Sequence, residues 1–275
     1  MPQTLTEIKA LLQSRGIQPR HRFGQNFLID ANKMARIVEL AGVGRGDAVL
    51  EIGPGTGALS EALLEAGARV VAVEIDRDLC AILRERLGGH ERFTLVEGDA
   101  MAGKSSLNPA IDAALGGRDT PFAHVANLPY NIASPLLATL AVDYPGMARA
   151  VVMVQREVAD RLAAAPGSKT YGPISVTLGA MCSVRLAMTL SPGCFWPRPK
   201  VDSAVVEITR RDEPLTDDPR GLAAFTQRLF QQRRKQVGSI LGRGRPLPGG
   251  IDASARPEQL SIDQIIALSR DRRSG

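Results

Sequence analysis

The sequence has few of the residues that build metal sites and disulfide frameworks. Its 275 residues include three cysteines and three histidines. Cys80, Cys182 and Cys194 are an odd number and form no Cys-x-x-Cys pair, and the histidines lie far from them or stand alone. We therefore expect neither a disulfide framework nor a structural metal site, and we assign no metal ligand.

Long apolar runs are missing as well. No window approaches the roughly 18 consecutive apolar residues of a membrane-spanning helix. The first fifteen residues include Glu7, Lys9 and Gln13, so they lack the apolar core of a signal peptide. We expect a soluble, cytoplasmic protein with no membrane partner, and we expect it to be a monomer.

Acidic residues are absent from residues 219–251, although the chain as a whole has a net charge of only +5 at pH 7. The basic residues in this span are Arg220, Arg228, Arg233, Arg234, Lys235, Arg243 and Arg245. A second basic cluster near the start of the chain contains Arg15, Arg20, Arg22, Lys33 and Arg36. Two local concentrations of positive charge favour nucleic acid as a partner, although a solvated basic face is the ordinary explanation of either one alone.

Short apolar runs alternate with amphipathic stretches after a polar, basic arm at residues 1–29. The runs predict strands at 48–52, 70–73, 93–96, 122–126 and 150–154. Helices are expected between them, the first with Asp30 as its N-cap, and residues 101–121 are expected to be a loop or weak helix. This alternation is typical of an α/β fold with a doubly wound, Rossmann-like parallel sheet.

The last third of the chain departs from this alternation. A helix is expected at 157–165, followed by strands at 184–190 and 204–209 that pair as an antiparallel edge. Residues 212–219 are expected to form a polar linker, after which helices are expected at 222–232, 237–241 and 262–269. We therefore divide the chain into a domain at 1–211 and a small C-terminal helical domain at 212–275.

A glycine-rich loop, Glu51-Ile52-Gly53-Pro54-Gly55-Thr56-Gly57, stands between a predicted strand and a predicted helix. Gly53 and Gly55 would let a ligand approach the backbone closely. Glu74 ends the next strand and can accept both hydroxyls of a ribose, and Asp99 follows the third strand, where it can accept from an adenine amino group. S-adenosylmethionine fits these strand ends better than NAD, which the glycines alone would also allow.

Asn127-Leu128-Pro129-Tyr130 follows the fourth predicted strand. The Asn127 amide and the Leu128 carbonyl can accept hydrogens from an exocyclic amine, while Pro129 fixes the turn and Tyr130 offers a stacking face. Such a group suits an adenine, although these four residues alone are also compatible with a simple proline turn.

Several motifs in a fixed order resemble the small-subunit (16S) ribosomal RNA adenine dimethyltransferases of the KsgA type over essentially the whole chain. The matching segments are 23–28, 51–57, Glu74, 98–100, 127–132 and 195–206. The resemblance implies a class I methyltransferase that transfers two methyl groups from S-adenosylmethionine to each of two adjacent adenines near the end of the small-subunit RNA. Thr56, Trp196 and Arg198 fill positions that vary in the family.

The resemblance also implies residue roles. It gives Asn26, Leu28, Gly53, Glu74, Asp99 and Asn127 as cofactor contacts, with the N-terminal arm folding back to supply the first two. Tyr130 and Phe195 would bracket the target base. We add a basic helix with Arg233, Arg234 and Lys235, together with Arg20 and Arg22, as candidate contacts to the RNA backbone.

Three alternatives remain open. One is a related enzyme that dimethylates large-subunit ribosomal RNA and confers antibiotic resistance, although Leu128 and the basic helical tail favour the small subunit. Another is a ribosome-assembly factor that binds without methylating, against which the intact Gly53 loop, Glu74, Asp99 and Asn127 argue. The weakest is a nicotinamide-dependent oxidoreductase, which offers no role for residues 127–130.

Overall fold

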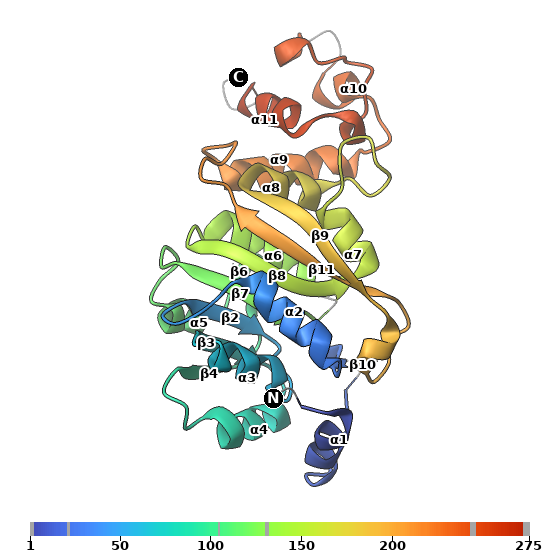
Figure 1. Cartoon of the computed structure of the whole chain (residues 1–275). Coiled ribbons are helices and arrows are strands. Elements are labelled where there is room, and N and C mark those ends of the chain that lie inside the picture. Colours follow the sequence, from blue (N-terminus) through green and yellow to red (C-terminus); the bar gives the residue numbers. More distant parts are fainter. Residues whose placement is uncertain (1–2, 21–22, 104, 130–131, 243–245, 272–275) are drawn as a thin grey trace.

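A computed structural model describes residues 3–20, 23–103, 105–129, 132–242 and 246–271 (Figure 1). Its centre is a sheet of seven strands in the order β4-β3-β2-β7-β8-β11-β9. The strands from β4 to β8 are parallel, whereas β11 is antiparallel to both of its neighbours. The expected doubly wound α/β sheet and its antiparallel edge are therefore confirmed.

The strands of this sheet follow the apolar runs of the sequence. Their bounds are Ala48–Ile52 (β2), Arg69–Glu74 (β3), Phe93–Glu97 (β4), Phe122–Asn127 (β7), Met147–Gln155 (β8), Cys182–Leu190 (β9) and Ser203–Arg210 (β11). All five residues of β2 are buried, as expected for a central strand of a parallel sheet that is covered on both faces.

Helices cover both faces of the sheet and bury a separate apolar cluster on each. One face carries α2 (Ala31–Ala41), α3 (Ala58–Glu65) and α4 (Arg77–Leu87), and the other carries α5 (Pro109–Leu115), α6 (Ala133–Asp143) and α7 (Arg156–Leu162). Successive residues of a strand point to opposite faces of the sheet. Val71 therefore packs in the cluster under α5, α6 and α7, and its neighbour Ala72 packs in the cluster under α2, α3 and α4. Asp30 caps α2 as predicted, because its side chain accepts from the Lys33 backbone N–H at 3.0 Å.

The N-terminal arm is more ordered than its polar composition suggested. Its helix α1 (Leu5–Gln13) begins with a capping box between Thr4 and Glu7, and Ile8 and Leu12 pack against α4. Further along, β1 (Phe27–Leu28) pairs with β10 (Phe195–Trp196), which follows the short 3-10 helix η2 (Pro192–Cys194). The arm is thus joined to a loop almost 170 residues later, far beyond the range of a local pattern.

Two further segments depart from expectation. Residues 101–121, expected to be a loop or weak helix, form the hairpin of β5 (Met101–Gly103) and β6 (Ser106–Leu107) followed by α5. An unexpected helix, α8 (Pro173–Met181), contributes Leu178 to the cluster under the sheet and Val176 to that of the C-terminal helices. Because α8 is buried on opposite sides, it lacks the one-sided apolar stripe by which a helix is recognised in a sequence.

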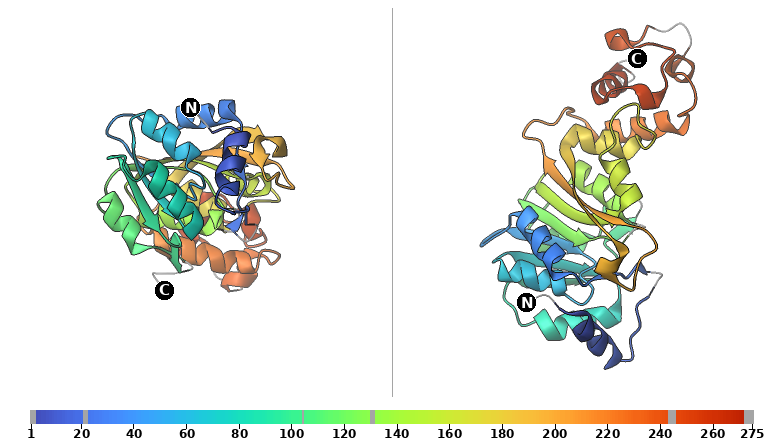
Figure 2. Two further views of the ribbon diagram at one scale, coloured as in Figure 1. Left: turned by 90° about the horizontal axis from the view of Figure 1, so that it is seen from below. Right: turned by 45° about the vertical axis from the view of Figure 1, so that its right-hand side comes forward.

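The C-terminal helices lie beyond the end of the sheet remote from α1 (Figure 2). They are α9 (Pro219–Gln231), α10 (Val237–Leu241) and α11 (Ile262–Asp271), with the 3-10 turns η3 (Pro248–Gly250) and η4 (Pro257–Gln259) between them. Their apolar cluster also takes in Tyr171 and α8, so it extends across residue 212. The domain boundary at 211/212 stays a prediction.

Arg210, at the end of β11, holds the C-terminal end of α6. Its guanidinium donates to the carbonyls of Ala141 (3.1 Å), Tyr144 (2.9 Å) and Met147 (2.9 Å). The last carbonyls of a helix have no partners within the helix, and a cation there also opposes the negative end of the helix dipole. Arg210 thereby fixes the helix that follows Asn127 and Pro129 in the chain.

Replacing Arg210 with alanine should lower the free energy of unfolding by about 2–3 kcal/mol, because several partly buried carbonyls lose a charged donor. Urea unfolding monitored by circular dichroism measures the change. The matched control is Arg185→Ala, which removes only an exposed ion pair with Glu207 on the same sheet edge and should cost less than about 1 kcal/mol. Equal losses in the two variants would contradict the anchoring role.

Candidate active site

The carboxyl ends of β4, β3, β2 and β7 meet at one cavity, as expected for a parallel sheet of this kind. The residues that sequence analysis proposed and that line it are Asn26, Leu28, Gly53, Gly55, Glu74, Asp99, Asn127 and Pro129. The structure thus brings together residues from the arm, the glycine loop and three further strand ends. Their roles as ligand contacts stay predictions.

The glycine loop forms part of the cavity wall through backbone that tolerates no side chain. Gly53 and Gly55 have φ of +72° and +63°, in the left-handed region. A Cβ on Gly55 would stand 3.0 Å from Cε1 of Phe27, and one on Gly53 would stand 3.4 Å from Cδ of Pro129. The loop therefore packs closely against both the arm and the turn that follows β7.

Glu74 is buried at the end of β3 and is held by the backbone. Its Oε1 accepts from the Asp76 N–H at 2.9 Å, and its Oε2 accepts from the Gly55 N–H at 3.2 Å. Burial raises the pKa of this carboxyl to about 7. Each oxygen keeps a second lone pair, so Glu74 can also accept from two hydroxyl groups of a ligand.

Glu51 is a cavity residue to which sequence analysis assigned no role. It is 1% exposed, and its Oε2 accepts a hydrogen bond from Ser60 of α3. Burial raises the pKa of Glu51 to about 8, and the nearby charge of Glu74 raises it further. A signal was present, because Glu51 is a single carboxylate in an otherwise apolar strand directly before the glycine loop.

The ionisable side chains in the described lining of the cavity are all acidic. Its ionisable residues are Glu51, Glu74 and Asp99, and the lining includes no Lys, Arg or His. Asp99 is exposed at the rim, where its side chain accepts from the Met101 N–H at 2.9 Å. A wall of carboxylates repels a pyrophosphate and attracts a cation. The cavity therefore disfavours a nicotinamide dinucleotide.

Asn127 joins the end of β7 to the arm. Its Nδ2 donates to the backbone carbonyl of Asn26 at 2.7 Å, across 101 residues of sequence. A carbonyl can only accept, so this partner fixes which end of the amide is nitrogen. The other end, Oδ1, is thereby set as an acceptor at the edge of the cavity.

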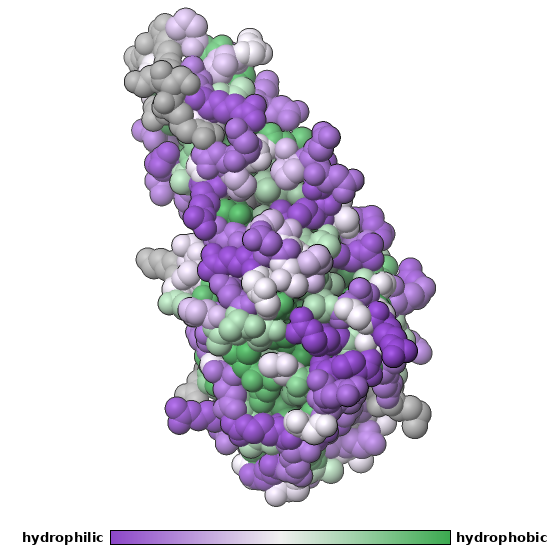
Figure 3. Space-filling view, turned by 90° about the vertical axis from the view of Figure 1, so that its left-hand side faces the viewer, coloured by the Kyte–Doolittle hydropathy of each residue, from purple (hydrophilic) through white to green (hydrophobic). Residues whose placement is uncertain are grey.

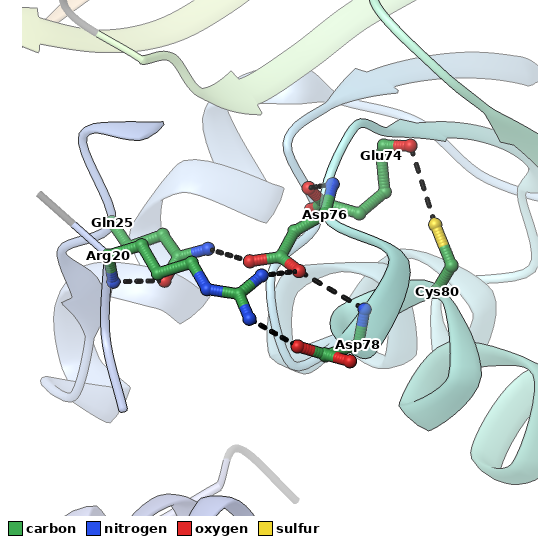
Figure 4. Close-up of polar contacts among 6 residues, drawn as sticks. All are labelled: Arg20, Gln25, Glu74, Asp76, Asp78 and Cys80. Carbon is green, nitrogen blue, oxygen red and sulfur yellow. Dashed lines mark hydrogen bonds and ion pairs between the residues drawn. The ribbon is translucent and has the colours of Figure 1, made fainter. Parts of the chain in front are cut away.

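The arm is fastened beside the cavity by Arg20 and Gln25 (Figure 4). Arg20 donates to Asp76 at 2.6 Å and also pairs with Asp78, while the Gln25 side chain donates to Asp76 at 2.9 Å. The predicted contact of Arg20 with RNA stays a prediction. The structure uses its charge within the protein, where it neutralises a carboxylate that is 1% exposed.

Arg233 is a second basic residue whose charge is used internally. It pairs with Glu258 at 2.6 Å and donates to the Lys169 carbonyl at 2.8 Å. Arg233, Arg234 and Lys235 were expected within a helix, but they lie in the turn between α9 and α10. Of the three, Arg234 and Lys235 are exposed and Arg233 is half-buried.

Phe195, predicted to stack on the target base, does not line the cavity. Phe195 is 3% exposed, pairs with Leu28 between β1 and β10, and belongs to the apolar cluster rather than to the cavity lining. Its role in stacking on a base stays a prediction. The Leu128 side chain is also buried in the core. Tyr130 and Arg22 lie outside the described residues.

A family model described as Ribosomal RNA adenine dimethylase matches residues 16–268. The chain belongs to this family. Membership accounts for the resemblance of the separate motifs and for the long C-terminal extension after β11. With it, the expected methyltransferase activity and S-adenosylmethionine as the cofactor are confirmed.

Curated members of the family are similar over nearly the whole chain. A protein of Opitutus terrae is 44% identical over 98% of this chain and 98% of its own, and one of Rhodococcus opacus is 43% identical over 96% and 92%. Both are named Ribosomal RNA small subunit methyltransferase A.

Solved structures agree with the fold. The 23S rRNA methyltransferase ErmE is 26% identical, with a TM-score of 0.68 over 89% of this chain and 98% of its own. A dimethyladenosine transferase from Plasmodium falciparum is 23% identical, with a TM-score of 0.73 over 90% of this chain and 98% of its own. Within the described part of this family member, no helix is long and apolar enough to cross a membrane.

Arg20→Gln should weaken binding of S-adenosylmethionine about tenfold or more, because the arm that supplies Asn26 and Leu28 loses two charged hydrogen bonds. Isothermal titration calorimetry measures the dissociation constant. Arg15→Gln is the matched control, since it also removes an ion pair between the arm and α4, but with the exposed Glu85. We expect less than about a twofold change there, and similar losses in both variants would contradict a specific role for Arg20.

Proposed function

We propose that this protein transfers methyl groups from S-adenosylmethionine to the exocyclic amino groups of two adjacent adenosines near the 3' end of small-subunit ribosomal RNA, during maturation of that subunit. The observation that carries the proposal is the Asn127 amide, whose oxygen is set as an acceptor beside an acid-lined cavity. The names of relatives up to 44% identical favour the small subunit as the substrate.

The cavity residues fit the cofactor in a simple order along the sheet edge. Asp99 at β4 would accept from the adenine amino group and Glu74 at β3 from the ribose hydroxyls. The backbone at Gly53 and Gly55, with Asn26 and Leu28 of the arm, would enclose the remainder. When bound, S-adenosylmethionine supplies an electrophilic methyl group on a positively charged sulfur.

Asn127 and Leu128 would prepare the target nitrogen. The lone pair of an exocyclic adenine nitrogen is delocalised into the ring, which makes it a poor nucleophile. Acceptance of its hydrogens by Asn127 Oδ1 and the Leu128 carbonyl favours a pyramidal nitrogen with a localised lone pair. The rigid β7 end then holds that lone pair in line for transfer, so that alignment is present before reaction.

This scheme requires no strong general base. The methylated nitrogen is cationic, and it can lose its proton to water after transfer. An amide can therefore stand where an acid-base enzyme would have a carboxylate. We also propose that Tyr130 and Phe195 stack on the unstacked base, which would offset part of the unstacking cost at about 1–3 kcal/mol per base.

The C-terminal helices are proposed as the RNA-docking part. Hydrophilic residues cover most of the face shown in Figure 3, including the narrow upper part formed by these helices. Arg234 and Lys235, in the turn between α9 and α10, are exposed. Contacts from such side chains to phosphates position an RNA without reading its sequence. That the protein acts as a cytoplasmic monomer remains a prediction.

Methylation of large-subunit RNA is the second candidate, favoured by the similarity to ErmE. It is weaker because the identity to that protein is 26%, compared with 44% to the Opitutus terrae relative. Assays with immature small and large subunits in parallel distinguish the two. A binding factor without activity would transfer no methyl group to either.

Asn127→Ala should lower the rate of methyl transfer at least about a hundredfold, since it removes the acceptor that localises the lone pair. The measurement is transfer of labelled methyl groups to immature small subunits at saturating cofactor. Asn32→Ala, an exposed amide on α2, is the matched control and should keep the wild-type rate. Equal rates for wild type and Asn127→Ala would overturn the proposed mechanism.

Replacing Arg234 and Lys235 together with glutamine should weaken RNA binding and reduce the slope of log affinity against log salt by about one to two units. Fluorescence anisotropy with a labelled small-subunit RNA fragment measures this slope. The control with the same loss of charge is Arg45→Gln with Arg77→Gln, two exposed residues of the sheet domain. If the slope is unchanged by the first pair, the turn after α9 does not contact phosphates.

A further inference from the structure

Glu51 lies near the carboxyl end of β2 and lines the cavity, where the charged sulfur of the cofactor would be bound in the proposed reaction. Glu74 stands at the end of β3 and Asn127 at the end of β7, and β2 lies directly between these strands. If the ribose is held at β3 and the target amine at β7, the end of β2 would hold the part of the cofactor that lies between them. Glu51 is the ionisable residue that β2 contributes to the cavity lining.

The described residues that line the cavity with Glu51 include no cation. Across the cavity, β3 contributes Glu74 and β4 contributes Asp99, both acidic, while α2 contributes Met34 and the arm contributes Gln25 and Asn26. On α3, the Ser60 hydroxyl donates to Glu51. Arg86 pairs with Glu61, the residue after Ser60.

Asp76, the next acidic residue after Glu74 in the chain, already has its own hydrogen-bond partners. Asp76 is bound by Arg20 and Gln25, so its charge is neutralised from the side of the arm. Among the described residues of the cavity lining, Glu51 and Glu74 are therefore two buried carboxyls without a positive neighbour of their own. They share one ligand cavity, and like charges at such a site oppose each other's ionisation.

We propose that Glu51 is the counter-charge for the sulfonium of S-adenosylmethionine, and that it makes the protein prefer this cofactor over its product through a proton that the Glu51–Glu74 pair gives up on binding. The inference rests on the proposed function, because it assumes that methyl transfer uses this cavity.

The proton balance follows from burial. In the free protein the carboxyl of Glu51 has a pKa of about 8 and that of Glu74 about 7, so the pair retains a proton at neutral pH. A bound cation favours the ionised form, and the pair then releases its proton to the buffer. Binding therefore strengthens as pH rises through this range, and protonation opposes it below.

The same balance separates cofactor from product. S-adenosylmethionine carries a positive sulfur, whereas S-adenosylhomocysteine has lost that charge with its methyl group. Once the charge is gone, nothing compensates the two buried carboxylates, and the pair takes a proton back from solvent. The product is then held only by contacts that the two molecules share. Glu51 thus assists product release without touching the target base.

Calorimetric titration of both ligands, in buffers of differing ionisation enthalpy, tests this at about pH 6, 7 and 8. For wild type we expect proton release with S-adenosylmethionine, a dissociation constant that falls by up to about tenfold per pH unit, and little change with S-adenosylhomocysteine. The amino group of the ligand also titrates, but it does so equally with every variant and cancels in the comparison.

Glu51→Gln is the matched variant, because its amide has the shape of the protonated carboxyl. At about pH 8 it should lose about tenfold in affinity for S-adenosylmethionine and little for S-adenosylhomocysteine, with less proton release. Its thermal midpoint at about pH 6 should equal that of wild type. Ser60→Ala removes the donor that favours ionised Glu51, so it should move the pH dependence of binding upward.

Three outcomes decide the matter. An unchanged preference for S-adenosylmethionine in Glu51→Gln would overturn the role of Glu51 while leaving the proposed function standing. The same would follow if Ser60→Ala left the pH dependence where it is in wild type. Failure of wild type to bind S-adenosylmethionine at any pH would overturn the proposed function and this inference with it.

Discussion

The hydrogen bond from Asn127 Nδ2 to the carbonyl of Asn26 is the contact on which the site depends. It joins the arm to the end of β7 and at the same time determines which atom of the Asn127 amide is left as an acceptor at the cavity. The arm can reach Asn127 because β1 pairs with β10 and because Arg20 is fastened to Asp76. The proposed enclosure of the cofactor and the proposed orientation of the nucleophile would therefore follow from one arrangement of the chain.

Electrostatics complement this geometry. Buried Asp76 pairs with Arg20, whereas Glu51 and Glu74 have no such cation among the described cavity residues. Burial therefore disfavours the ionised forms of Glu51 and Glu74 and raises their pKa values. The free cavity is consequently prepared for a positively charged ligand before that ligand arrives. The two carboxyls are in position before binding, and they give up a proton when a cation binds.

Local patterns predicted most of the sheet and much of the cavity, because β-strands, the Gly53 loop and the residues directly after each strand are separated by short intervals. The arm was less predictable. Its contacts join Asn26 to Asn127 and Arg20 to Asp76, and no local periodicity records a partner 56 to 101 residues away. Basic composition likewise could not reveal that Arg20 is already paired with an acid within the protein.

The most direct test of the account is hydrogen exchange of the Asn127 side-chain amide, followed by nuclear magnetic resonance in the 15N-labelled protein. The bond to Asn26 predicts that the bonded Nδ2 proton exchanges at least about ten times more slowly than the amide protons of the exposed Asn32. Exchange of Asn127 as fast as that of Asn32 would contradict the claim that the arm fixes the orientation of this amide.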